Sequence, residues 1–377
     1  MGEVLEFYSG LTYSPKNVIK FGGTFVLRSS NVKDGEIIDA DNVYVESNVV
    51  NCINVNVGDV IVVVRNGSRS LIGKHAQIKH EMTDTVIGAF MTGLRSSQSN
   101  FINALLDTPQ FDIEITKNLG ATINQITTGA FKQMNFCIPK LKEEQALIGT
   151  FFRTLDSLIA ANQRKVDRLK QMRSAYLQQM FPHTGERVPR VRFDGFDEDW
   201  GVKKLGELLT EFSRKSNMED EFPILSSTNK GMERRLGRVS STSNIGYKII
   251  ENGNLVLSPQ NLWLGNININ DIGVGLVSPS YKTFTLNNIE CAFIKPQLRT
   301  QKMLDKYKEV SPQGASVVRR NLEIESFEVI EIKLPCYEEQ SSIGDFFQNL
   351  DGQISSQAKK IEQLKQLKIA YLRKMFI

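Results

Sequence analysis

Residues 143–181 read EEQALIGTFFRTLDSLIAANQRKVDRLKQMRSAYLQQMF, and residues 338–376 read EEQSSIGDFFQNLDGQISSQAKKIEQLKQLKIAYLRKMF. The two stretches align without a gap, and about 17 of the 37 positions that follow Glu144 and Glu339 are identical. Identity at this level marks an internal repeat, so a duplicated structural unit organises the chain.

Each copy of the repeat has the apolar pattern of a long helix with one buried face. Apolar side chains follow one another at steps of four and three residues, which is the heptad pattern of a coiled coil. Because neither stripe can be buried alone, we expect the two helices to pair as an antiparallel coiled coil. The predicted helix-pairing residues are Ile148, Phe152, Leu155, Ile159, Asn162, Val166, Leu169 and Tyr176 in the first copy, and Ile343, Phe347, Leu350, Ile354, Gln357, Ile361, Leu364 and Tyr371 in the second.

A carboxamide side chain interrupts each stripe at the same place, Asn162 in one copy and Gln357 in the other. Two interpretations stay open. A buried polar layer would fix the register of the helix pair at a cost in stability. Alternatively, the amides lie at a solvated edge and specify nothing.

The repeat divides the chain into alternating domains and helices. The domains also match each other faintly: GDVIVVVRNGS (58–68) aligns with GNLVLSPQNLW (253–263), and FVLRSSNVK (25–33) with FPILSSTNK (222–230). We therefore predict an α+β protein with two pseudo-symmetric mixed α/β domains joined by the helices. The predicted parts are a first domain at 1–140, which is short at its N-terminus, a helix at 141–182, a second domain at 183–336 and a second helix at 337–377.

Composition excludes several classes of protein. Hydrophobic residues make up 41% and charged residues 23%, as in an ordinary globular protein, which excludes disorder as a description of the whole chain. No apolar run approaches the roughly 18–20 residues of a membrane span, and no secretory signal is seen. The four cysteines form no CxxC pair and only three histidines are present, so we expect no metal site, no disulfides and a cytoplasmic location.

Catalytic motifs are absent or fail. The run GSRSLIGKH (67–75) resembles a phosphate loop, but the spacing between its glycines is too long and His75 stands where Ser or Thr is needed. Glu331-Ile332-Lys333 resembles part of a nuclease motif, but its alternation is that of a half-exposed strand. The tetrapeptide that holds adenine in amino-methyltransferases is missing. The sequence therefore predicts no catalytic residue.

Polar side chains suited to DNA recognition gather at strand-to-loop junctions in both domains. Arg and Lys reach phosphates and guanine edges, while Asn and Gln can read adenine. The net charge of +4 permits nucleic-acid binding. The alternative is that these loops are polar because they face water, and Trp263 fits a core position as well as a contact. The candidates for DNA contact are Arg28, Ser29, Asn31, Arg65, Asn66, Ser68, Arg69 and Lys74 in the first domain, and Arg214, Lys215, Ser226, Asn229, Lys230, Gln260, Asn261, Arg319 and Arg320 in the second.

The repeated EEQ…IG.FF..LD…LKQ…AYL..MF motif and the segment RFDGFDEDWGVKKLGEL (192–208) resemble the specificity subunit of type I restriction-modification systems. LRSSNVKDGEI (27–37) is also typical of that family. The resemblance implies two target recognition domains, each reading one half of a bipartite site in double-stranded DNA, with the helices setting the spacer. It also implies two modification subunits that carry S-adenosylmethionine and methylate adenine N6, and restriction subunits that complete the complex. The specificity chain itself would have no catalytic site and no cofactor.

Alternative functions remain at this point. The chain could be a rod-like coiled-coil scaffold without a role on DNA, or a silent or truncated variant in which only the second domain reads DNA. An enzyme with its own nuclease or methyltransferase site is disfavoured by the missing motifs. Salt-dependent DNA affinity would separate a DNA reader from a scaffold, because phosphate contacts release counterions.

Overall fold

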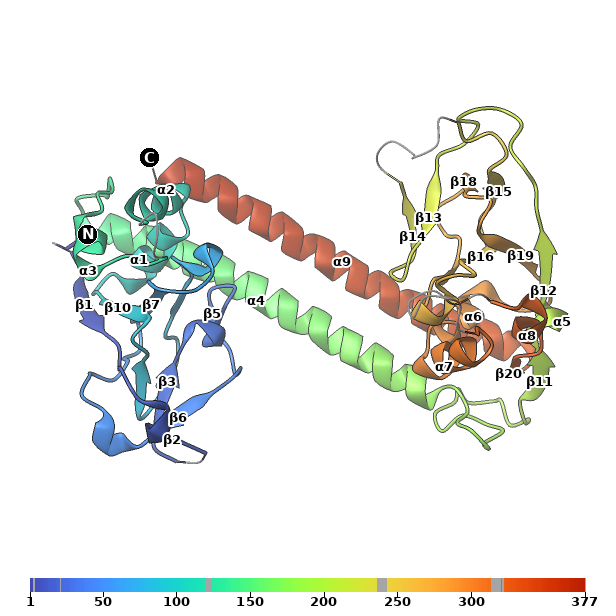
Figure 1. The fold of residues 1–377 in the computed structure, drawn as a ribbon, viewed down its shortest axis with the longest axis horizontal. Helices are drawn as coiled ribbons and strands as arrows, with labels where there is room; N and C mark the ends of the chain where they lie inside the picture. Colours follow the sequence, from blue (N-terminus) through green and yellow to red (C-terminus); the bar gives the residue numbers. More distant parts are fainter. Residues whose placement is uncertain are drawn as a thin grey trace. The chain divides into compact units, whose positions relative to one another are not determined.

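The structure, a computed structural model, describes residues 1–2, 4–20, 22–119, 124–235, 243–312, 320 and 322–376. They form two compact units: unit 1 consists of Met1–Arg164 with Ala358–Ile377, and unit 2 of Lys165–Gln357. Both repeats are long helices, α4 (Lys142–Gln179) and α9 (Tyr337–Met375) (Figure 1). Each helix therefore contributes one part to unit 1 and the other part to unit 2.

The helices pair antiparallel within each unit, as predicted. In unit 1 the ring centroids of Phe151 and Tyr371 are 5.1 Å apart, and Asp156 Oδ1 lies 2.5 Å from Lys368 Nζ. Residue numbers rise along α4 while those of the partners fall along α9, which defines the antiparallel direction.

Unit 2 repeats these contacts with the two helices exchanged. Tyr176 and Phe346 lie 5.0 Å apart, and Arg173 Nε lies 2.6 Å from Asp351 Oδ1. These residues are the repeat counterparts of the residues that meet in unit 1. The internal repeat of the sequence is thus a repeat of contacts as well.

Most of the predicted seam is buried. Tyr371 is the exception, since its side chain is 38% exposed while Leu372 is 3% exposed. A straight helix drifts relative to a strict heptad, and the end of α9 also turns Leu372 and Phe376 toward the core of unit 1. The buried predictions are Ile148, Phe152, Leu155, Val166, Leu169, Ile343, Phe347, Leu350 and Ile361, and the half-buried ones are Ile159, Asn162, Tyr176, Ile354, Gln357 and Leu364.

In the part of the chain that the structure describes, neither carboxamide is seen to form a hydrogen bond across the helix pair. Asn162 Nδ2 donates to Leu158 O of its own helix at 2.7 Å. Gln357 Oε1 is buried and accepts no hydrogen bond from any described residue. The geometry of Asn162 fits the solvated-edge interpretation better than a cross-helix polar layer.

Unit 1 is built on two small sheets, and Figure 1 shows its helices gathered around the start of α4 and the end of α9. The first sheet is antiparallel, with the strand order β1-β10-β7-β8: Glu6–Ser9, Met91–Arg95, Val60–Val63 and His75–Gln77. The second has the order β2-β6-β3-β9: Val18–Ile19, Val43–Val45, Thr24–Leu27 and Thr85–Ile87. The helices are α1 (Ser99–Leu106), α2 (Pro109–Asn118) and α3 (Thr128–Gln133), and a short hairpin joins β4 (Val32–Lys33) to β5 (Glu36–Ile37).

Unit 2 repeats the first of these sheets. Its strand order is β12-β19-β16-β17: Leu209–Phe212, Lys282–Leu286, Leu255–Leu257 and Ile267–Ile269. Three strand pairs surround it: β13 (Leu225–Ser227) with β14 (Met232–Arg234), β15 (Lys248–Ile250) with β18 (Gly275–Val277), and β11 (Gly201–Lys204) with β20 (Glu331–Leu334). The helices are α5 (Leu205–Leu208), α6 (Cys291–Gln297), α7 (Gln301–Glu309) and α8 (Ile324–Glu328).

The matching strand orders confirm the predicted pseudo-symmetry. The aligned sequences 58–68 and 253–263 supply the equivalent strands β7 and β16, each of which is buried along its whole length. A strand buried on both faces reads as a continuous apolar run rather than as an alternation, which is why VIVV and LVL match.

A glycine that both repeats share marks the place where each long helix touches its domain. A Cβ atom on Gly149 of α4 would lie 2.5 Å from the backbone nitrogen of Phe101 in α1. A Cβ atom on its counterpart, Gly344 of α9, would lie 2.8 Å from the Cβ of Ala292 in α6. By contrast, Gly352 of α9 has open space around its missing side chain.

We therefore expect alanine to have opposite effects at these glycines. Gly149→Ala should lower the free energy of unfolding by about 1–3 kcal/mol, because rigid backbone must move to admit the methyl group. Gly352→Ala should raise it by about 0.5–1 kcal/mol, since alanine is the better helix former and nothing obstructs it. Denaturant unfolding of both variants measures this, and an unchanged or raised unfolding free energy for Gly149→Ala would contradict the close packing at Gly149.

The segment before β11 has no equivalent in the described part of unit 1. In unit 2, Arg192 forms a two-pronged ion pair with Glu339 at the start of α9, and both N–O distances are 2.8 Å. Glu339 is completely buried, whereas its repeat counterpart Glu144 is exposed. The same repeat position is thus an interior anchor in one unit and a surface carboxylate in the other.

Candidate DNA interface

One group of predicted residues comes together in unit 1. We call loop cluster 1 the set Arg28–Ser30, Arg65–Arg69 and Lys74. Asn66 Nδ2 donates to Ser29 Oγ at 3.0 Å, and Lys74 Nζ lies 3.4 Å from Ser29 O. These bonds join the loop after β3 to the loop between β7 and β8, so two separate stretches of sequence form one surface.

Loop cluster 1 presents two exposed arginines. The Arg65 guanidinium lies 5.0 Å from the ring centroid of Phe90, which is 51% exposed. Arg69 is exposed in the turn that follows. A guanidinium held over an aromatic ring keeps its donors free for a phosphate or a guanine edge. Phe90 was not among the predicted contact residues. A large apolar residue in the turn between two buried strands could have indicated it.

Two other candidates of unit 1 have structural roles. Asn31 is completely buried, and its side chain accepts from Arg28 N at 2.9 Å and donates to Ala40 O at 2.7 Å. It is therefore not available to DNA in this conformation, because its amide already closes the loop around itself. The Arg28 guanidinium is bound to Asp41 at 2.5 Å, which neutralises part of its charge.

A second group of candidates comes together in unit 2. We call loop cluster 2 the set Ser227–Gly231 and Gln260–Asn266. Ser227 Oγ donates to Asn266 Oδ1 at 2.6 Å and accepts from Asn268 Nδ2 at 2.8 Å. These bonds tie the turn that carries Asn229 and Lys230 to the loop that carries Gln260 and Asn261, and all four side chains are exposed. The linking amides of Asn266 and Asn268 were not foreseen, although asparagines at a strand end are a turn signal.

Arg320 belongs beside loop cluster 2. Its guanidinium lies 5.7 Å from the ring centroid of Trp263, and its Nη1 donates to Ser311 O at 2.9 Å. Trp263 is half-buried, and its Nε1 has no hydrogen-bond partner among the described residues. Arg319 lies outside the described residues.

The remaining candidates of unit 2 are not brought into this group by any hydrogen bond between described residues. Arg214 pairs with Glu251 at 2.8 Å, and both side chains are exposed. Lys215 is exposed and forms a backbone bridge with Lys248. Ser226 is half-buried in β13.

A partly buried charge network adjoins loop cluster 1 through His75, which follows Lys74. Behind Lys74, His75 Nε2 lies 3.4 Å from Asp107 Oδ1, and Lys368 Nζ lies 2.7 Å from Asp107 Oδ2. Burial lowers the pKa of His75, but the Asp107 carboxylate outweighs it, so the pKa is raised above its usual 6.5. Burial opposes ionisation of Asp107, yet His75 and Lys368 together lower the pKa of Asp107 to about 2.

The raised pKa of His75 predicts a pH-dependent contribution to stability. A group whose pKa is higher in the folded state contributes fully below its unfolded pKa, and the contribution is lost as pH rises through the folded pKa. We expect His75→Gln to lose more unfolding free energy at about pH 5.5 than at about pH 8.5, relative to the unaltered chain. Urea unfolding of both proteins at the two pH values measures this. An equal loss at both pH values would contradict a raised pKa of His75 in the folded state.

No metal or membrane site is found in the described ranges. No three His, Cys, Asp or Glu side chains converge there as they would around a metal ion. None of the helices among these residues has an apolar stretch of the length that a bilayer crossing requires.

Two matching α+β domains, each with a polar loop cluster and a helix of the shared pair, define a modular binding protein. Residues 1–171 and 197–366 both match the type I restriction modification DNA specificity domain. The chain belongs to this family and carries two copies of its domain.

Curated relatives agree with this assignment. The chain is 28% identical over 185 residues to the type I restriction enzyme EcoKI specificity subunit of Escherichia coli (strain K12), covering 46% of this chain and 40% of the relative. It is 26% identical over 221 residues to the StySPI specificity subunit of Salmonella potsdam, covering 55% and 47%. The chain therefore spans less than half the length of these relatives in either match.

The fold has a solved counterpart. The S subunit of a type I restriction-modification system from M. genitalium superposes with a TM-score of 0.65 at 13% identity, covering 100% of this chain and 94% of that one. At this identity the likeness concerns the fold alone, which is that of two domains with two long helices.

Proposed function

We propose that this chain is the DNA specificity subunit of a type I restriction-modification complex. Each unit would read one half of a bipartite site in double-stranded DNA through its loop cluster. The observation that carries the proposal is the duplication of the family's domain, with exposed polar side chains gathered on each copy. These are Arg65 and Arg69 in loop cluster 1, and Asn229, Lys230, Gln260 and Asn261 in loop cluster 2. Such side chains supply both phosphate contacts and base-edge hydrogen bonds.

The chemistry would be carried out by partner subunits. Two modification subunits would bind S-adenosylmethionine and methylate adenine N6, and restriction subunits would complete the complex in the cytoplasm. The chain itself would have no catalytic residue and no cofactor. Extrusion of the target adenine would then be the task of the modification subunit.

The decisive experiment is mapping of adenine methylation by long-read sequencing in cells that express this chain with its modification subunit. A split, asymmetric motif is expected, with one half contributed by each unit. A motif built from one repeated half-site would mean that only unit 2 reads DNA. Absence of any motif from an assembled complex would favour a silent variant or a scaffold.

A further inference from the structure

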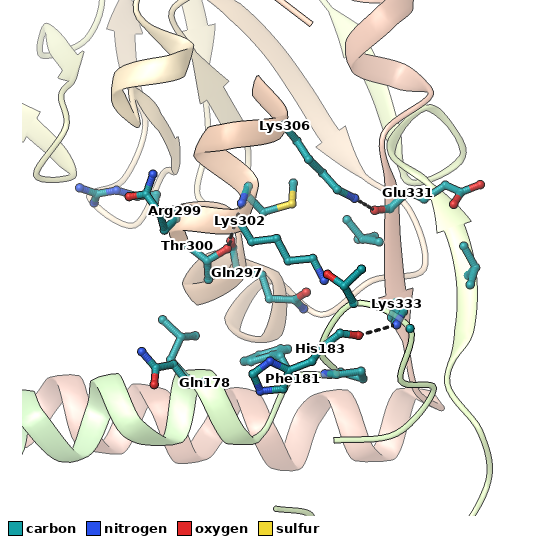
Figure 2. Close-up of a pocket in the computed structure, with 18 of the residues that line it drawn as sticks. Gln178, Phe181, His183, Gln297, Arg299, Thr300, Lys302, Lys306, Glu331 and Lys333 are labelled. Atoms are coloured by element: carbon teal, nitrogen blue, oxygen red, sulfur yellow. Dashed lines mark hydrogen bonds between the residues drawn. The ribbon is translucent and has the colours of Figure 1, made fainter. Parts of the chain in front are cut away.

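A cavity of about 640 Å³ lies in unit 2, bounded by the last turns of α4, the segment 181–185, the start of α7 and strand β20 (Figure 2). Its lining is cationic. Arg299, Lys302, Lys306 and Lys333 line it, and among its described lining residues the only carboxylate is that of Glu331.

No described carboxylate pairs with these cations. Lys306 Nζ donates to the main-chain oxygen of Glu331 at 2.7 Å, and Lys333 Nζ donates to that of His183 at 3.0 Å. Figure 2 shows Lys306 extending from α7 toward β20. Arg299 and Lys302 form no ion pair with any described residue. A carbonyl accepts a hydrogen bond without cancelling the charge, so the cavity keeps its positive field.

Two of the cavity cations have lowered pKa values. Burial, followed by the nearby charges of Lys333 and Lys306, lowers the pKa of Lys302. Burial, followed by the charge of Arg173, lowers the pKa of Arg299. Burial is the larger cause of both shifts, and a bound anion would raise the pKa of each group.

The start of α7 adds a further group of donors to the same cavity. The first turn of α7 follows the N-cap Thr300 and contains no acidic residue, so its free N–H groups and the helix dipole favour an anion. Gln297 also lines the cavity, but its Nε2 is buried from solvent and has no hydrogen-bond partner among the described residues.

Comparison of the two units tests whether the positive charge of the cavity follows from the fold that they share. Helix α2 of unit 1 follows the N-cap Thr108 as α7 follows Thr300. When the two helices are aligned on these caps, unit 1 has Asp107, Gln110 and Glu114 at the positions of Arg299, Lys302 and Lys306. When the long-helix repeats are aligned, Ile138 stands at the position of Lys333. None of the four cations is shared, so the basic cavity is a property of unit 2 alone and not of the common fold.

We propose that this cavity is a phosphate-binding site. Several cations on the lining of one cavity and a helix N-terminus suit a compact, multiply charged anion whose oxygens accept in several directions. The phosphate would belong to a small phosphorylated molecule or to a nucleic-acid backbone. The proposal is independent of which bases the loop clusters read.

Calorimetric titration of the full chain with inorganic pyrophosphate tests the proposal. Saturable binding is expected, with Kd about tenfold higher or more in Arg299→Gln and in Lys302→Gln, because each removes a charged hydrogen-bond donor. Lys170→Gln, at an exposed lysine of α4 in the same unit, is the matched control and should bind as the unaltered chain does. Thermal unfolding verifies that every variant is folded.

The source of the phosphate is distinguished by binding to a DNA duplex over a range of salt concentrations. If the site takes the DNA backbone, Lys302→Gln should reduce the slope of log affinity against log salt by about 1. If the site takes a small molecule, that slope stays unchanged while pyrophosphate binding is still weakened. Absence of saturable pyrophosphate binding, or equal binding by the folded Arg299→Gln/Lys302→Gln double variant, overturns the proposal. The pyrophosphate and salt-dependence results do not depend on the methylated motif, which tests the proposed function separately.

Discussion

Replacing Phe347 with alanine should lower the free energy of unfolding of unit 2 by about 3–5 kcal/mol. Phe347 is 1% exposed on the pairing face of α9. Its ring lies 5.9 Å from that of Phe181, and the Arg173 guanidinium lies 5.8 Å from its centroid. The substitution would remove the aromatic surface that joins α9 both to α4 and to the core of the domain.

Guanidinium unfolding followed by circular dichroism measures this loss. Met172→Ala is the control, because Met172 is also a large apolar residue of a paired helix in unit 2 but is 42% exposed. Its effect should stay within about 0.5 kcal/mol, as for ordinary surface changes. Equal shifts of the two unfolding midpoints would mean that the helix seam is not a stabilising interface.

Removing Arg65 and Arg69 together should weaken DNA binding by about a hundredfold or more, because an arginine that contacts a base or a phosphate contributes about 1–3 kcal/mol. Both arginines are exposed in loop cluster 1. Since each unit would read its own half-site, the loss should be larger for a duplex with an intact first half-site than for one in which that half is scrambled.

Fluorescence anisotropy of the assembled complex at fixed salt measures this effect. Lys117→Ala is the matched control, because Lys117 is an exposed cation of unit 1 that pairs with Glu114 on α2 at 2.8 Å. It should leave affinity unchanged within about twofold, as expected for a cation that contacts no phosphate. A double variant that binds both duplexes as the control does would place DNA recognition outside loop cluster 1.

Much of the fold could be predicted because the sequence contains an internal repeat, and the two copies could be compared with each other. Two copies of one helix, aligned without a gap, revealed the seam, and positions such as Ile148 and Ile343 are buried as expected. The failure at Tyr371 has a local cause, since the last turns of α9 also pack on the domain and bury Leu372 instead. The heptad pattern predicts which residues face the partner helix, but it does not predict the contact of the last turns of α9 with the domain.

The candidate site could be predicted only in part. Residue type proposed Arg65, Arg69 and Asn31 alike, but the structure exposes the two arginines and buries Asn31. An asparagine that reads a base and one that closes a loop look alike in sequence. The cationic cavity was missed for a related reason, because Arg299 and Lys333 lie far apart in the chain and only the fold brings them together.

The cross-helix ion pairs have one more consequence. Helix α4 carries both an acid, Asp156, and a base, Arg173, and α9 carries Asp351 and Lys368 at the same spacing. Two copies of α4 placed antiparallel would therefore match Asp156 with Arg173 twice. A surface of this kind is isologous, since it is its own partner under a two-fold rotation. One domain with one helix therefore carries both charged residues that pair across an antiparallel homodimer. When two such halves are joined in one polypeptide, each half can acquire its own specificity.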